Sequence, residues 1–368
     1  MRVTSDFDNQ VLIQKSKRES LVQEFLSEST DNEKKTFFKS FLDLHLLIHH
    51  YLIESNRFTV ILDTNVIQDI LSSESNRVRE VRHIATTALL CFLEDYAHAN
   101  VWLGVTPAVL YELNGQQPIA STAEYRKAMG IVEHVAIKLG ISTYTIGFQS
   151  YADLKRASKL LHSDAQRIKK AVTKLATQNW KMDFEHGDGR ISIPMAVAEA
   201  SIPNIKLNYL DPFYVKWALM NFVEKRMFEQ NKHQKKARRM MNNGQKGISK
   251  LFKINKKGAL MGLADIELLS KADLTAQSAS NSPLITSAIT YDKDLLATLY
   301  ERMGTIRDGG NLVGNNVDPS DGAGLFMYQM KISETRSKHI NERSKVYMEA
   351  LNEFSEANFK SVEASAPS

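Results

Sequence analysis

Cysteine is almost absent from this sequence, which has a single one, Cys91, in 368 residues. One thiol cannot form an intramolecular disulfide, and it cannot supply a cysteine-based zinc site. The first ten residues, MRVTSDFDNQ, also lack the apolar core that a secretory signal needs. These absences favour a reducing compartment, and we expect a cytoplasmic protein.

Long apolar runs are lacking as well. The strongest ones, Leu46–Ile48 and Tyr51–Ile53, are separated by histidines and are far shorter than the roughly 20 residues that cross a bilayer. We therefore expect no membrane span. With 43% hydrophobic and 24% charged residues, the chain has the composition of a globular protein that buries a substantial core.

Acidic residues are scarce in one segment only. Between Lys225 and Lys257 there are twelve Lys and Arg and one acid, while the rest of the chain has 35 basic and 41 acidic residues. Such a density of positive charge attracts polyanions and can release counterions from a phosphate backbone, although a solvated helix face would have the same composition. The candidates for nucleic-acid contacts are Lys232, Lys235, Lys236, Arg238, Arg239, Lys246, Lys250 and Lys253.

The hydrophobic pattern predicts an α/β fold. Apolar residues at helical spacing predict two or three helices within residues 1–56, and β-branched and aliphatic runs predict strands at 58–62, 100–105 and 283–290. Further helices are predicted at 78–98, 108–114, 258–274 and 330–359. Because strands alternate with helices, we expect a mostly parallel central sheet.

Five parts follow from this pattern. They are an N-terminal helical extension (1–56), the first part of the core (57–115), a large helical insertion (116–257) that contains the basic segment 225–257, the second part of the core (258–325), and a C-terminal helix with a flexible tail (326–368).

Acidic residues follow two of the predicted strands directly. Asp63 comes after the strand at 58–62, and Asp292 comes after the strand at 283–290. In parallel sheets, ligands bind beyond the carboxyl ends of the strands, so both side chains should face one crevice. Glu112 lies one to two turns into the helix after the second strand, and Asp265 lies near the middle of the helix predicted at 258–274.

Carboxylates gathered at one edge of a sheet point to a metal ion. They raise each other's pKa values unless a cation shares the site. Mg²⁺ and Mn²⁺ prefer oxygen ligands and keep several waters, so substrate phosphate oxygens can complete the octahedron. Such ions polarise a phosphate and generate hydroxide from water. The pattern therefore predicts phosphodiester hydrolysis with Mg²⁺ or Mn²⁺ as cofactor.

The four acids stand in strings that resemble the four acidic motifs of PIN-domain nucleases, in the same order. The strings are VILDTNV at 60–66, TPAVLYEL at 106–113, DIELL at 265–269 and TYDKDL at 290–295, and the resemblance covers roughly residues 57–115 and 258–325. It implies a PIN-like three-layer core that cleaves RNA, usually single-stranded, with metal ligands and catalytic residues Asp63, Glu112, Asp265 and Asp292. It also implies groups that orient these carboxylates, namely Asn65, Thr290 and Asp294.

The sequence departs from the family in one spacing. Glu112 and Asp265 are 153 positions apart, whereas compact PIN domains separate these motifs by a few tens of residues. The insertion 116–257 must therefore loop out. The third motif has similar neighbours in Glu267 and Asp273. Because Asp265 and Glu267 point to different sides of a helix, only one can face the metal, and the apolar spacing favours Asp265.

We expect an endoribonuclease whose basic segment holds single-stranded RNA beside the acids, and the sequence leaves DNA open as a second substrate. By analogy with other elaborated nucleases, its role would be that of a toxin or an antiviral defence effector. The alternative is a catalytically inactive PIN-like module for RNA binding or assembly. The terminal helices are candidate surfaces for a homo-oligomer or for a regulatory protein partner.

Overall fold

The computed structural model describes residues 6–182, 192–235, 237–238, 251–256, 258–279, 284–299 and 334–363. Within these ranges, only the backbone is described for residues 53, 192–196, 275, 278–279, 334–341 and 359–363.

Four strands form a central sheet in the order β3-β2-β1-β6, and every neighbouring pair is parallel. The strands are β1 (Arg57–Leu62), β2 (Asn100–Val105), β3 (Thr143–Thr145) and β6 (Ile285–Ile289). The predicted α/β fold with a mostly parallel sheet is confirmed. Leu62 pairs with Ile289, so the residues that follow, Asp63 and Thr290, leave the sheet side by side.

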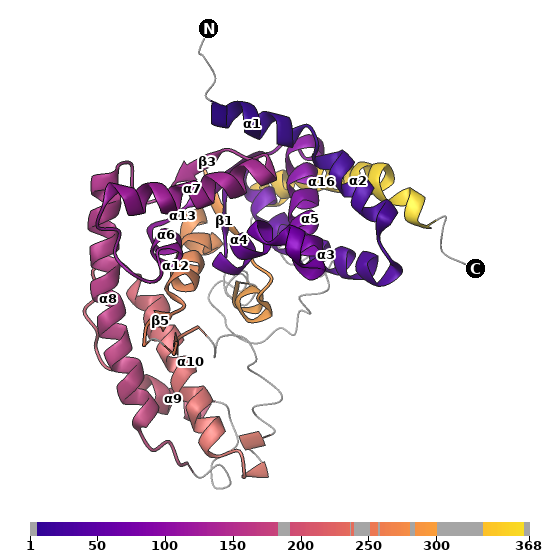
Figure 1. Cartoon of the computed structure of the whole chain (residues 1–368). Coiled ribbons are helices and arrows are strands. Elements are labelled where there is room, and N and C mark those ends of the chain that lie inside the picture. Colours follow the sequence, from indigo (N-terminus) through magenta and orange to yellow (C-terminus); the bar gives the residue numbers. More distant parts are fainter. Residues whose placement is uncertain are drawn as a thin grey trace.

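Helices cover both faces of this sheet (Figure 1). The helices between β1 and β2 are α4 (Thr64–Leu71) and α5 (Arg77–Cys91), which continues as a π-helical turn (Phe92–Tyr96). Those between β2 and β3 are α6 (Pro107–Leu113) and α7 (Thr122–Leu139). Those that precede β6 are α12 (Leu263–Ala272) and α13 (Leu274–Ala279). None of the described helices is long and apolar enough to span a membrane.

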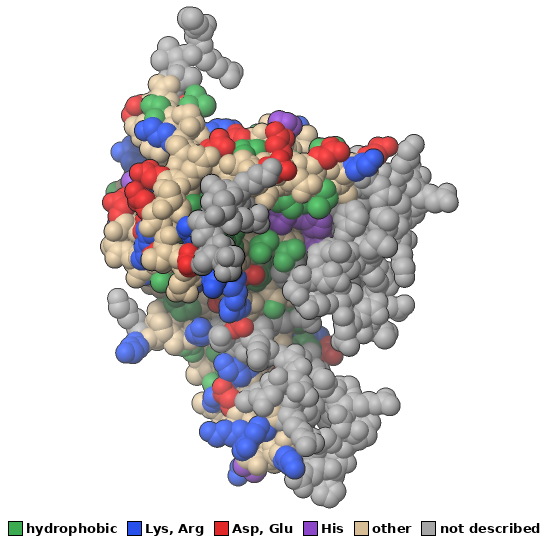
Figure 2. Space-filling view, turned by 90° about the vertical axis from the view of Figure 1, so that its right-hand side faces the viewer, with side chains coloured by type: hydrophobic (Ala, Val, Ile, Leu, Met, Phe, Trp, Pro, Cys, Tyr) green, Lys and Arg blue, Asp and Glu red, His purple; other side chains and the backbone are tan. Residues whose placement is uncertain are grey.

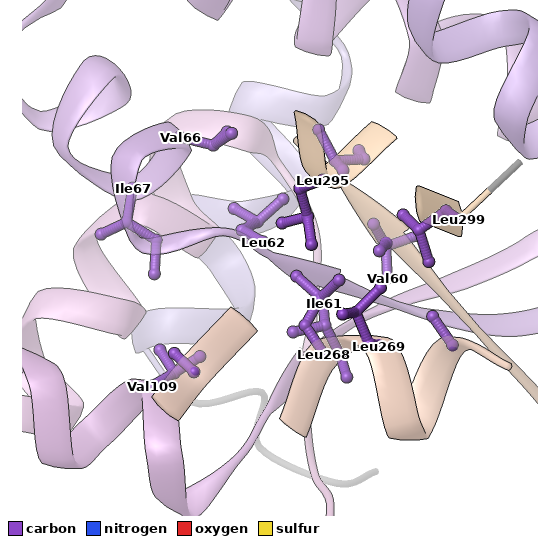
Figure 3. Close-up of a cluster of buried hydrophobic side chains, with 14 of the residues drawn as sticks. Val60, Ile61, Leu62, Val66, Ile67, Val109, Leu268, Leu269, Leu295 and Leu299 are labelled. Atoms are coloured by element: carbon purple, nitrogen blue, oxygen red, sulfur yellow. The ribbon is translucent and has the colours of Figure 1, made fainter. Parts of the chain in front are cut away.

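The last five residues of β1 are all buried because both faces of the strand are covered. Figure 3 shows Ile61 beside Leu268 and Leu269 of α12 on one face. Leu62 lies on the other face, toward Leu295 of the short helix at residues 293–299. This two-sided burial holds the carboxyl end of β1 rigidly, and Asp63 follows immediately.

The chain termini extend the same hydrophobic core rather than forming separate units. Two or three helices are predicted for residues 1–56, and three are found among the residues described there: α1 (Asp6–Lys15), α2 (Arg18–Glu28) and α3 (Asp31–Glu54). The C-terminal helix α16 (Glu334–Glu363) packs against α3. There the Tyr347 hydroxyl lies within hydrogen-bond distance of the buried His45 ring.

In the described part of the chain, a helical arm projects from the core (Figure 1). Its helices are α8 (Tyr151–Thr177), α9 (Ser192–Ser201) and α10 (Pro212–Gln230). The expected insertion at 116–257 begins too early, because α7 and β3 lie within that range and β3 extends the central sheet. Three residues of polar composition, Thr-Tyr-Thr, are too short a run to have been predicted as a strand.

A tight turn corrects the prediction for residues 258–274. The helix begins only at Leu263, after a hairpin of β4 (Lys253–Ile254) and β5 (Leu260–Met261). Gly262 has a φ of 93°, and a Cβ there would stand 1.7 Å from the carbonyl oxygen of Leu251. Only glycine fits this turn. Asp265 therefore lies in the first turn of α12, not near the middle of a helix.

Candidate metal centre

Asp63 is the first residue after β1 and the N-cap of α4, and it is 2% exposed. Its Oδ1 accepts the backbone N–H of Asn65 at 2.9 Å and the Asn65 amide Nδ2 at 3.2 Å. Its Oδ2 accepts the hydroxyl of Thr290 at 2.8 Å. Two of the three predicted orienting residues, Asn65 and Thr290, therefore contact this carboxylate.

Thr290 also joins Asp63 to Asp292. The buried Thr290 hydroxyl oxygen accepts the backbone N–H of Asp292 at 3.0 Å while its proton goes to Asp63. The Asp292 side chain is exposed at this edge, and its Oδ1 accepts the backbone N–H of Asp294 at 2.8 Å. Asp294 thus orients Asp292 through its main chain.

Glu112 connects the two halves of the core. Its Oε2 accepts the hydroxyl of Thr64, the residue after Asp63, at 3.0 Å. Its Oε1 accepts the backbone N–H of Ala264, in the first turn of α12, at 3.2 Å. A carboxylate is stabilised at a helix N-terminus by the free N–H groups and by the helix dipole. Glu112 therefore ties β1 and β2 to the helix that carries Asp265.

Asp265 follows Ala264 directly and lies within electrostatic range of the other three acids. Burial, and then the charges of Asp63, Glu112 and Asp292, raise its pKa well above the ordinary value, while the Lys253 ammonium lowers it. The structure thus brings all four predicted acids to the carboxyl edge of the sheet.

The two competing acids of the third motif have other partners. Glu267 is buried on another side of α12, where it accepts the backbone N–H of Ala108 at 2.9 Å and the hydroxyl of Tyr209. Asp273 accepts the hydroxyl of Tyr214. Both carboxylates anchor neighbouring helices, which agrees with the choice of Asp265.

Burial also raises the pKa values of the other two inner carboxyls. For Asp63, hydrogen bonds from Asn65 and Thr290 oppose the effect of burial, and the charge of Asp292 adds to it. For Glu112, hydrogen bonds from Ala264 and Thr64 oppose it, and the charge of Asp63 adds to it. The edge is therefore a place where negative charge is unfavourable unless a cation is present.

The donor set fits Mg²⁺ or Mn²⁺, because it consists of carboxylates and contains no thiolate or imidazole. The side chains are not preassembled around one point: in the described part of the chain, no three His, Cys, Asp or Glu side chains form a group that could hold an ion as it stands. Several of the carboxylate oxygens accept hydrogen bonds from the protein instead. Each carboxylate has about four lone-pair sites, so an oxygen that accepts a hydrogen bond can still coordinate an ion.

The predicted nucleic-acid contacts divide into two groups. Lys253, on β4, is exposed and lies close enough to Asp265 to lower its pKa. Lys232, Lys235 and Arg238 follow the far end of α10, where Asn231 bonds the backbone of Trp180. A helix of 19 residues is about 28 Å long, so these three lie at the tip of the arm and not beside the acids.

Figure 2 shows Lys and Arg side chains gathered over this lower end of the molecule. The arm tip is thus basic and exposed, as the sequence predicts for the segment. The other predicted contacts lie outside the described residues: Lys236, Arg239, Lys246 and Lys250.

Two groups at the site were not predicted from the sequence. Thr64 reads as an ordinary first residue of a helix, and the Ala264 contact uses only the main chain. Neither has a side-chain signal that distinguishes it. Compared with models of protein families, with curated proteins and with solved structures, the chain matches none.

Proposed function

We propose that this chain is a metal-dependent endoribonuclease with a PIN-like core, in which Asp63, Glu112, Asp265 and Asp292 hold Mg²⁺ or Mn²⁺. The observation that supports it is a continuous set of contacts. Asp292 is joined to Asp63 through Thr290, and Glu112 spans from the residue after Asp63 to the residue before Asp265. Four sequence segments thus deliver carboxylates to one edge.

Structural roles alone do not account for these four charges. A neutral Asn or Ser caps a helix as well as Asp does. Buried carboxylates that repel one another are unfavourable by themselves, so their accumulation favours a site made for a cation.

The bound ion would supply the chemistry of phosphodiester hydrolysis, by polarising the phosphate and activating a water. The residues of the chain provide its geometry. Thr290 and Asn65 fix the rotamer of Asp63, and the main chain of α12 fixes Glu112. Lys253 is exposed beside Asp265, where it would attract a substrate phosphate.

Cleavage of a labelled single-stranded RNA in Mn²⁺ tests the proposal directly. Wild type should cut, and EDTA should stop it. Asp63→Asn should cut more than about 100-fold more slowly, because even residues that only orient metal ligands contribute about 10- to 100-fold. Asp6→Asn, on the exposed first turn of α1, is the matched control and should cut like wild type.

The rival hypothesis, an inactive PIN-like module for RNA binding or assembly, predicts another result. Wild type and Asp63→Asn would bind the RNA equally well, and neither would cut it in Mn²⁺ or in Mg²⁺. That outcome would overturn the nuclease proposal.

A further inference from the structure

A cavity of about 210 Å³ lies between α6, α8 and the β4–β5 hairpin. Most of the side chains that line it are polar or aromatic and able to form hydrogen bonds. They include Tyr111, Gln116, Gln117, His162, Gln166 and Lys169.

The cavity shares two elements with the metal centre. Tyr111 in its wall is the neighbour of Glu112 on α6. The hairpin carries Lys253, beside Asp265, on its first strand and Leu260, in the cavity wall, on its second strand. The cavity and the metal centre therefore border the same helix and the same hairpin, and a strand of RNA that reached the acids would pass these two elements.

Hydrogen-bond contacts link three of the side chains in the wall. The hydroxyl of Tyr111 lies 2.9 Å from Nδ1 of His162, and Nε2 of Gln166 lies 3.4 Å from the other ring nitrogen. Gln116, which also lines the cavity, has a φ of 58°, a left-handed conformation that is unfavourable for glutamine and persists only where its surroundings impose it. Its backbone N–H donates to the Tyr111 carbonyl at 3.0 Å.

The charge of the cavity is opposite to that of the metal centre. Among the described residues that line it, none is acidic. The Lys169 ammonium lies 3.6 Å from the position that a Cβ would take on Gly258, so it reaches the turn of the hairpin. The cavity thus offers one cation and several amides, which suits a neutral heterocycle with an attached phosphate.

We infer that this cavity binds a nucleobase of the RNA substrate next to the cleaved phosphodiester. The amides of Gln116, Gln117 and Gln166 meet the edge of the base, because a glutamine amide both donates and accepts hydrogen bonds. Lys169 meets the adjoining phosphate. Unstacked bases of single-stranded RNA are recognised by such edge contacts. The inference rests on the proposed nuclease function and gives the arm, through α8, a part in sequence preference.

Binding of the four nucleoside 5′-monophosphates, measured by calorimetry in EDTA, tests the cavity without any cleavage. One base should bind at least about 10-fold tighter than the weakest of the four, since a hydrogen-bonding site discriminates against bases that leave its groups unpaired. Gln166→Ala should reduce this discrimination. Lys169→Ala should weaken all four nucleotides alike. Lys170→Ala, the exposed neighbour outside the cavity, is the control and should bind as wild type does.

Sequencing the cleavage products of a randomised single-stranded RNA supplies the second test. Wild type should prefer one base at a fixed position beside the cut, and Gln166→Ala should lose that preference. If the protein cleaves RNA without a base preference and binds no nucleotide, the proposed base site is wrong and the proposed nuclease function still stands. If the protein binds nucleotides, Gln166→Ala and Lys169→Ala weaken that binding, and no RNA is cut, then the nucleotide site is supported and the nuclease proposal is wrong.

Discussion

Glu112 accepts the backbone N–H of Ala264 at 3.2 Å, although the two residues are 152 positions apart in the sequence. This contact joins α6, the helix after β2, to α12, and the whole arm lies between them in the chain. The other oxygen of Glu112 accepts from Thr64, beside Asp63. The candidate metal centre therefore depends on contacts that no local segment could form by itself.

Thr290→Val should weaken Mn²⁺ binding and lower kcat by about 10- to 100-fold, the usual effect of losing a group that orients a metal ligand. Valine has the same shape but cannot donate to Asp63 or accept from the N–H of Asp292. Calorimetry with Mn²⁺ and steady-state cleavage measure the two effects.

Thr290→Ser keeps the hydroxyl and should restore most of the Mn²⁺ affinity and most of kcat. If Thr290 served only to fill space, the smaller serine would not restore them. Thr143→Val, on the remote strand β3, is the control. Equal Mn²⁺ affinity in Thr290→Val and wild type would contradict a positioning role for Thr290.

Asp265→Asn should make the metal-free protein more stable at pH 8, by about 2 °C or more in Tm. The pKa of Asp265 is raised in the folded state by burial and by three carboxylates. Its favourable contribution is therefore present below the unfolded-state pKa of about 4, and it is lost as the pH rises through the folded-state pKa. Asparagine does not titrate, so the gain in stability should vanish near pH 4.

Thermal unfolding in EDTA from pH 4 to 8, repeated with Mn²⁺, measures this effect. Mn²⁺ should stabilise wild type more than Asp265→Asn at pH 8. Glu133→Gln, on an exposed position of α7, should leave the pH dependence unchanged. Parallel pH profiles for wild type and Asp265→Asn would contradict the electrostatic account.

Gly262→Ala should destabilise the fold by about 3 kcal/mol or more, beyond the usual range of single substitutions. The new Cβ would meet backbone atoms of Leu251 at a φ that alanine rarely adopts. Chemical denaturation gives the free energy of unfolding. Gly130→Ala is a matched control with opposite sign: this helical glycine has open space around its Cβ position, and the change should stabilise α7 by about 0.5–1 kcal/mol. If Gly262→Ala is as stable as wild type, the turn is not as tight as described.

Charge reversal at Lys235, Lys236, Arg238 and Arg239 should weaken RNA binding while leaving Mn²⁺ affinity unchanged. The slope of log K against log salt should become less steep by about 0.7 for each phosphate that the protein no longer neutralises. Fluorescence anisotropy of a labelled RNA at several salt concentrations measures both quantities. The control reverses four charges on α3 and α7: Lys35, Lys39, Arg126 and Lys127. Unchanged binding would remove the basic segment from the mechanism.

The sequence was sufficient to predict the sheet edge but not the details around it. Asp63 and Asp292 follow strands whose apolar runs are plain in the sequence, and a parallel sheet brings such residues to one edge. The sequence predicted Asp265 near the middle of its helix, whereas it lies in the first turn. The helix begins late because Gly262 makes a tight turn against the Leu251 carbonyl, and hydrophobic periodicity does not reveal such a contact.

The sequence predicted a helical insertion, but it did not predict where in space the helices of that insertion would extend. Its start was predicted too early because β3 has no apolar run. The expectation that the basic segment lies beside the acids holds for Lys253 and not for Lys232, Lys235 and Arg238. Helix lengths, and the contacts at which the arm leaves the core, decide where its tip lies, and neither follows from charge.

The anchors of the arm make it inseparable from the rest of the protein. The buried Asp164 on α8 accepts the backbone N–H groups of Asn208, Tyr209 and Leu210, and the hydroxyl of Tyr209 reaches Glu267 on α12. In a shortened chain without the arm, the buried Glu267 would lose the hydrogen bond from the Tyr209 hydroxyl, close to the N-terminus of α6. Excising this appendage would therefore loosen the scaffold of the carboxylates instead of yielding a minimal, smaller enzyme.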